Sequence, residues 1–142
     1  MQKEAAARSI IIEQMSMDFV DLEGMSTPLD AELEYSAADP FAVSILFKGE
    51  PAPVRWTFAR DLLIEGFYEP TGDGDVHVWP CLGTDGRAVV ILELVSPSGE
   101  VLIQMNSREL SHFLRRTITA VPRGSEADHL DFDDELTSLL SA

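Results

Sequence analysis

The sequence has few residues that could crosslink the chain, no segment that could anchor it in a membrane, and few basic residues. Its 142 residues include one cysteine, three histidines and 10 lysines plus arginines against 25 acidic residues, which gives a formal net charge of −15. The single cysteine, Cys81, excludes an internal disulfide and a cysteine-based zinc cluster, and it fits a reducing compartment. No run approaches the roughly 18 to 20 apolar residues of a membrane helix, and the N-terminus lacks a signal-peptide core. We therefore expect a cytoplasmic protein with no direct membrane insertion.

The hydrophobic content is typical of one globular domain. Hydrophobic residues make up 45% of the chain, and the mean hydropathy is +0.03. A chain of this length buries roughly 70% of its unfolded surface on folding, so it can build a core without a disulfide or a metal. No internal repeat or low-complexity segment is visible. We expect a single domain over residues 1–142, in which residues 1–9 form an N-terminal extension and residues 124–142 form an acidic tail with a short helix.

Alternation of apolar and polar residues predicts strands over much of the chain. The expected strands cover residues 10–20, 31–35, 41–47, 54–58, 75–81, 87–95 and 100–105. The segment STPLDA, residues 26–31, is interpreted as a turn, and Pro80 is expected to end its strand because proline cannot donate to a sheet ladder. The last three strands follow one another through short glycine-containing turns, which predicts an antiparallel meander.

Two helices are expected along the chain, and a third near its end. Residues 59–67, ARDLLIEGF, change to a helical period, with Gly66 as a C-cap. Asn106 and Glu109 have the spacing of a capping box, and the buried face of the helix that follows consists of Leu110, Phe113, Leu114, Thr117, Ile118 and Val121. Asp131 can cap a last helix over residues 133–140. The predicted fold class is α+β: about seven or eight antiparallel strands, a short inserted helix and a C-terminal helix-loop-helix.

The expected strands and helices do not bring residues that could act in catalysis together in one site. His77 and Cys81 are four residues apart on one expected strand, about 13 Å, so Cys81 is interpreted as a small buried or turn residue and not as a nucleophile. The histidines lack metal-ligand spacing, and GDGD at residues 72–75 lacks the ligands of a calcium loop and the lysine of a phosphate loop, which leaves a turn. Trp56 and Trp79 are interpreted as core residues rather than base-stacking platforms. We expect no enzyme, no cofactor and no metal site.

The basic residues are concentrated in the last third of the chain. Arg108, Arg115, Arg116 and Arg123 place four of the ten basic residues within sixteen positions. One interpretation is a solvated helix face. The other is a docking strip for an acidic partner or for the chain's own acidic tail, which follows with no further basic residue.

An apolar stripe near the end of the chain needs a surface to pack on. It consists of Leu136, Leu139 and Leu140, on a helix shorter than the roughly 12 to 15 residues that an isolated helix requires. We expect this helix to dock on its own or a neighbouring subunit. Together with the four arginines, the stripe forms the candidate partner or assembly surface.

Several blocks of the sequence, taken together, resemble a known family. They are ADPFAV at 38–43, WTFARDLLIEG at 56–66, PTGDGDVHVWP at 70–80, FLRRT at 113–117, VPRGSE at 121–126 and DFDDELTSLL at 131–140. Jointly they are similar to the SsgA-like family of actinobacterial sporulation and cell-division proteins over about residues 31–142. The length, GDVHVWP and the DELTSLL ending are most similar to the SsgB branch. The resemblance implies a regulator without enzymatic activity that helps localise the tubulin-like division GTPase FtsZ to future septum sites.

The resemblance also implies a fold and an assembly. The family fold is similar to that of whirly-type single-stranded nucleic-acid binders, with twisted antiparallel sheets and a homotrimeric assembly. The expected partners are therefore FtsZ, further copies of this chain and another SsgA-like protein, at the division septum. The alternative function is a whirly-like single-stranded nucleic-acid-binding protein. Because such binders neutralise phosphates with clustered basic residues, the net charge of −15 opposes this alternative, and no nucleic-acid partner is expected.

Overall fold

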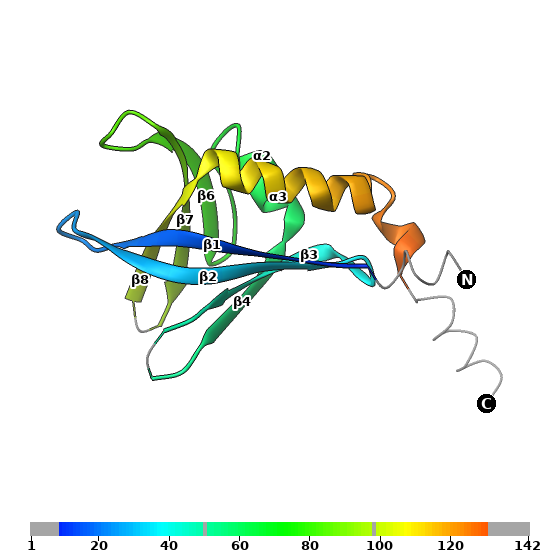
Figure 1. The fold of residues 1–142 in the computed structure, drawn as a ribbon, viewed down its shortest axis with the longest axis horizontal. Helices are drawn as coiled ribbons and strands as arrows, with labels where there is room; N and C mark the ends of the chain where they lie inside the picture. Colours follow the sequence, from blue (N-terminus) through cyan, green and yellow to red (C-terminus); the bar gives the residue numbers. More distant parts are fainter. Residues whose placement is uncertain (1–8, 50, 98, 131–142) are drawn as a thin grey trace.

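The computed structural model describes residues 9–49, 51–97 and 99–130 of the chain (Figure 1). The elements are β1 (Ile10–Val20), β2 (Ser26–Ser36), β3 (Asp39–Phe47), β4 (Val54–Ala59), α2 (Arg60–Gly66), β5 (Thr71–Asp73), β6 (Val76–Leu82), β7 (Ala88–Ser96), β8 (Gly99–Asn106), α3 (Ser107–Ala120) and the 3₁₀ helix η1 (Glu126–His129). All strand pairs are antiparallel, and the strands form one sheet in the order β4-β3-β2-β1-β8-β7-β6-β5. The predicted α+β class and its strand content are confirmed.

The sheet consists of two four-stranded meanders, each followed by a helix. Strands β1 to β4 precede α2, and strands β5 to β8 precede α3, a structural repetition that the sequence does not reveal. The halves meet where β1 pairs with β8, through three residue pairs only: Asp18 with Gln104, Phe19 with Ile103 and Val20 with Leu102. In Figure 1, β1 and β2 run across the view while β6 to β8 run up and down it, so the joined sheet is strongly curled.

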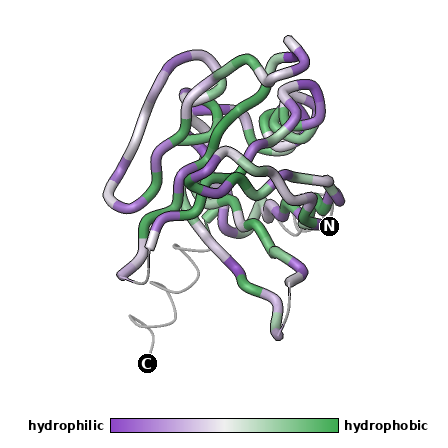
Figure 2. The backbone as a smooth tube through the Cα atoms, turned by 90° about the vertical axis from the view of Figure 1, so that its left-hand side faces the viewer, coloured by the Kyte–Doolittle hydropathy of each residue, from purple (hydrophilic) through white to green (hydrophobic). Residues whose placement is uncertain are grey.

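The two helices pack on the concave side of the curled sheet. Helix α3 contacts β1, β7 and β8, whereas α2 contacts β3, β4, β5 and β6. The alternation predicted for the strands is confirmed, since Met15 and Met17 of β1 and Leu33 of β2 are buried. Figure 2 shows the same alternation of hydrophobic and hydrophilic colour along the strands. On α3, Leu110 and Phe113 are fully buried, as the helical spacing predicted.

Two prolines lie inside strands where the sequence predicted a turn or a strand end. Pro28 in β2 pairs with Asp18 in β1, and Pro80 in β6 pairs with Val90 in β7. Strand β6 continues to Leu82. The predicted turn at residues 26–31 and the predicted end at Pro80 are therefore wrong. Each proline lies in a stretch with one neighbouring strand, because β3 pairs with β2 only from Ala31 and β5 pairs with β6 only up to Val78. A proline that lacks a donor is tolerated where no second ladder needs one.

Two glycines, one in a predicted turn and one at a predicted helix C-cap, have different roles in the structure. Gly74 has φ of +61° between β5 and β6, so the predicted turn at residues 72–75 is confirmed as a tight hairpin. Gly66, by contrast, is not a left-handed C-cap, because it lies inside α2 and the cap residue Phe67 has right-handed helical angles. A Cβ atom on Gly66 would lie 2.3 Å from Cγ1 of Val78. The glycine therefore lets α2 approach β6 closely.

Candidate functional site

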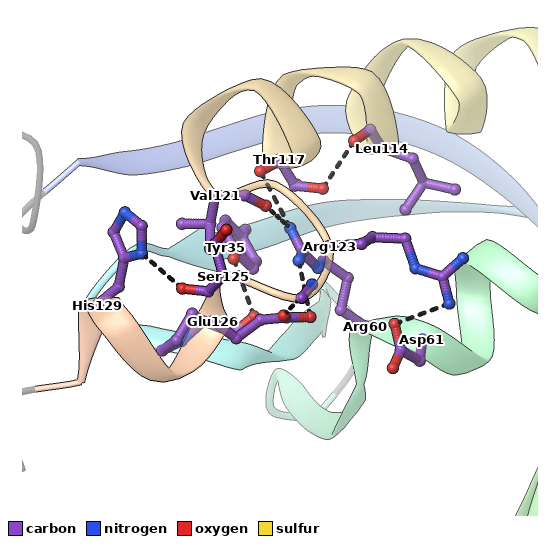
Figure 3. Close-up of polar contacts among 12 residues, drawn as sticks. Tyr35, Arg60, Asp61, Leu114, Thr117, Val121, Arg123, Ser125, Glu126 and His129 are labelled. Atoms are coloured by element: carbon purple, nitrogen blue, oxygen red, sulfur yellow. Dashed lines mark hydrogen bonds and ion pairs between the residues drawn. The ribbon is translucent and has the colours of Figure 1, made fainter.

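A buried arginine joins helix α2 to the end of helix α3. Arg60 is 1% exposed, and its Nη1 donates to the carbonyl oxygens of Thr117, at 3.1 Å, and Val121, at 2.8 Å. Its Nη2 donates to Oε2 of Glu126 at 3.1 Å (Figure 3). The last carbonyls of a helix lack partners within the helix and carry partial negative charge. Arg60 therefore adds a second donor to the Thr117 carbonyl, which already accepts from the Val121 N–H, and supplies one to the Val121 carbonyl just past the end of α3.

Glu126 and Tyr35 complete this buried cluster. The Arg60 guanidinium lies 5.0 Å from the centre of the Tyr35 ring, and the Tyr35 hydroxyl donates to the carbonyl oxygen of Pro40 at 2.9 Å. Burial raises the pKa of Tyr35 to about 12. A hydrogen bond from its own backbone N–H, with others from the Gly124 N–H and the Arg60 side chain, holds the pKa of Glu126 below its usual value despite burial. The cluster thus keeps a charged pair ionised inside the protein.

The Arg60 cluster is structural, and a sequence signal for it exists. Arg60 lies three and four residues before Leu63 and Ile64, which are both buried, so it lies on the apolar face of α2. An arginine at such a position must find several acceptors, since burying an unpaired charge is very costly. The sequence did not single it out, because nothing local indicates that Glu126 is the partner.

Two of the four predicted arginines are neutralised by carboxylates of the same chain. Nη1 of Arg116 lies 2.7 Å from Oε1 of Glu13 on β1, and Nε2 of His112 lies 3.3 Å from the same oxygen. Nη2 of Arg123 lies 3.3 Å from Oδ1 of Asp61 on α2 (Figure 3). These arginines hold α3 and the loop after it against neighbouring elements. They do not form a common strip with the other two.

The other two predicted arginines line an open groove. Its volume is about 690 Å³, and its lining residues are Phe67, Arg87, Ala88, Asn106, Ser107, Arg108, Ser111 and Arg115. Arg108, Ser111 and Arg115 lie three and four positions apart and therefore share one face of α3. Arg87 enters from the turn before β7, where its Nε lies 3.8 Å from Oδ2 of the exposed Asp85. We call the site formed by Arg87, Arg108 and Arg115 the arginine groove.

The cysteine and the histidines that the sequence offered as candidates do not lie together in one site. Cys81 is a free, exposed cysteine on β6, so its expected burial or turn position is wrong. Nδ1 of His77 lies 3.2 Å from Oε1 of Glu93 on β7, and Nδ1 of His129 lies 3.1 Å from the Ser125 carbonyl oxygen. Within residues 9–130, excluding 50 and 98, no group of three or more His, Cys, Asp or Glu side chains could hold a metal ion. Leu136, Leu139 and Leu140 and their predicted helix lie outside the described residues.

Among the described residues, no helix is both long enough and apolar enough to cross a membrane. The molecule is thus an acidic α+β protein whose described residues form a curled eight-stranded sheet, helices α2 and α3 on its concave side and a basic groove beside α3. This combination defines its class before any comparison with other proteins.

Comparisons with known sequences assign the family. A family model described as "Streptomyces sporulation and cell division protein, SsgA" matches residues 29–126. The chain is 49% identical over 117 residues to the sporulation-specific cell division protein SsgB of Streptomyces coelicolor, covering 82% of this chain and 85% of that protein. It is 46% identical over 131 residues to SsgB of Frankia casuarinae, covering 92% of this chain and 91% of that protein.

Solved structures agree with this assignment. A structure from work on SsgB mutations and longitudinal cell division in Streptomyces coelicolor matches with a TM-score of 0.82 and 42% identity, covering 87% of this chain and 98% of that one. The crystal structure of an SsgA-like sporulation-specific cell division protein from Thermobifida fusca matches with a TM-score of 0.84 and 35% identity, covering 93% and 96%. The chain therefore belongs to the SsgA family and, within it, to the SsgB branch, as its sequence blocks predicted.

Proposed function

We propose that this protein is a non-enzymatic regulator of sporulation-specific cell division that recruits or positions FtsZ at future septum sites. The observation that carries the proposal is membership of the SsgB branch, whose members are named as sporulation-specific cell division proteins. In this proposal the chain acts at the septum through binding and holds no cofactor. It also assembles with itself as a homotrimer and meets a second SsgA-like protein.

The distribution of titratable groups supports a binding role. The buried pair of Arg60 and Glu126 is occupied in holding the end of α3 in place. The arginine groove, in contrast, lies open on the surface with charged side chains directed at it from two elements. A surface of this kind suits recognition of a macromolecule, since electrostatic complementarity contributes chiefly to specificity and association rate.

Co-sedimentation with polymerised FtsZ from the same organism tests the proposal. The purified full chain is incubated with FtsZ polymers over a range of salt concentrations, and labelled single-stranded DNA serves as a parallel binding partner. We expect the chain to enter the FtsZ pellet and to leave the DNA unbound. Binding to DNA that weakens steeply with salt, without binding to FtsZ, would replace the proposal by the whirly-like nucleic-acid alternative.

The assembly is tested separately by multi-angle light scattering coupled to gel filtration. A mass of three times 15.7 kDa is expected for the homotrimer. A mass of one chain at micromolar concentration would remove the trimer from the proposal without affecting the FtsZ measurement.

A further inference from the structure

Carboxylates pair with six of the eight lysine and arginine side chains of the described residues. Lysine and arginine side chains in ion pairs are Lys48, Arg55, Arg60, Arg87, Arg116 and Arg123. Within residues 9–130, excluding 50 and 98, the two without such a pair are Arg108 and Arg115, and both line the arginine groove. Acidic residues outnumber basic residues by 25 to 10 in this chain. Two uncompensated arginines on one face of α3, lining one groove, are therefore a local exception to a surface rich in carboxylates.

The third arginine of the groove is only loosely held. Its contact with Asp85 measures 3.8 Å between Nε and Oδ2, and the two side chains are 79% and 64% exposed. An exposed ion pair of this kind contributes little, so Arg87 is free to exchange Asp85 for another carboxylate. Three guanidinium groups with planar, forked donors then surround one space, and each matches a carboxylate in a bidentate arrangement.

The remaining lining adds donors and a small apolar wall. Ser107 and Ser111 bring hydroxyl groups from α3, while Phe67 and Ala88 bring apolar surface from the end of α2 and the start of β7. A segment that carries carboxylates next to an apolar side chain would satisfy both kinds of surface. A volume of about 690 Å³ accommodates several residues of such a segment.

Acidic groups close to the groove limit the class of partner. Asp85 and Glu109, with Asp18, line a neighbouring hollow that shares Arg87 and Asn106 with the arginine groove. A nucleic-acid strand extends its negative charge far beyond three arginines and would meet these carboxylates as well as the net charge of −15. A short acidic peptide concentrates its charge within the groove. The surroundings of the groove thus favour a protein segment over a polynucleotide.

We infer that the arginine groove, formed by Arg87, Arg108 and Arg115, binds a short acidic segment of the division partner. This inference rests on the proposed function, because it assigns the surface through which that partner is held. The attraction is electrostatic and exposed to solvent, so binding weakens as ionic strength rises.

Paired double variants of the full chain test this assignment. R108Q/R115Q removes two charges from the groove, and R116Q/R123Q removes the same two charges from positions that Glu13, Asp61 and Glu65 already neutralise. Affinity is measured for polymerised FtsZ by co-sedimentation and for a fluorescent decaglutamate peptide by anisotropy, with oligo-dT in a third arm. Thermal melting confirms that both variants are folded.

We expect R108Q/R115Q to weaken binding of FtsZ and of decaglutamate at least about tenfold, while R116Q/R123Q stays within about twofold of the wild type. If FtsZ binds and both variants retain it, the groove assignment is overturned and the proposed function stands. If FtsZ does not bind but decaglutamate binds in a groove-dependent way, the proposed function fails and the acidic-segment assignment is supported for another partner. Failure to bind decaglutamate, or groove-dependent binding of oligo-dT, overturns the assignment.

Discussion

Replacing Arg60 by methionine should expose how much of the fold depends on one buried charge. The variant removes hydrogen bonds to the Thr117 and Val121 carbonyls and leaves the carboxylate of Glu126, which is 6% exposed, without its cation. Breaking a buried ion pair from one side costs about 3–5 kcal/mol. Since a domain is stable by about 5–15 kcal/mol in total, this is a large fraction of the free energy of unfolding.

Urea denaturation and thermal melting followed by circular dichroism measure this loss. For a domain of this size, the expected loss corresponds to a fall in Tm of about 10–17 °C. The double variant R60M/E126L should be more stable than R60M alone, because it leaves no buried charge unpaired. As a matched control, R123M removes an exposed arginine paired with Asp61 and should cost less than about 1 kcal/mol. An R60M variant within about 1 kcal/mol of the wild type would refute this account of the cluster.

Three further predictions concern stability and can be checked by the same melting experiments. Gly66→Ala forces a Cβ against Val78 and should lower the free energy of unfolding by about 1–3 kcal/mol. The loss should be smaller when G66A is introduced into the V78A variant than when it is introduced into the wild type. Asn106→Ala removes the side-chain oxygen that accepts from the Glu109 N–H at 3.1 Å and should cost about 1 kcal/mol, whereas N106D should retain the cap. The folded-state pKa of Glu126 lies below its ordinary value of 4.5, so the stability that its carboxylate contributes is complete above pH 4.5 and is lost as pH falls through the folded-state pKa. The variant E126Q should therefore flatten this part of the acid stability profile, and an unchanged profile would contradict this role of Glu126.

The sheet could be predicted from the sequence where one face of a strand is buried along its length. In the strands predicted over residues 10–20 and 75–81, the alternation of side chains matches the alternation of burial, with Met15, Met17, Val76 and Val78 buried. The prolines were misjudged because the cost of a missing donor depends on whether a second strand lies alongside. Whether a second strand lies alongside depends on how far β3 pairs with β2 and β5 with β6, and the residues next to each proline in the sequence do not show this.

The sequence does not reveal which of its arginines are paired with carboxylates, for a related reason. Nothing in the sequence distinguishes the four arginines near the C-terminus from one another, and their spacing does not show that Arg116 pairs with Glu13 on β1. Arg87, which completes the groove, is separated from Arg108 by all of β7 and β8. Long-range pairing therefore decides which arginines are neutralised and which remain available.

The place where the two halves of the sheet meet determines when the fold can close. Strand β1 is the first strand of the described residues and β8 the last, so their three residue pairs form only after all the strands between them have been synthesised. Arg60 must likewise wait for Glu126. Contacts between such distant residues slow folding, because a long loop must be closed before they form. Until then, the β1 edge of the first meander is uncovered, and an uncovered strand edge is open to pairing with a strand of another chain.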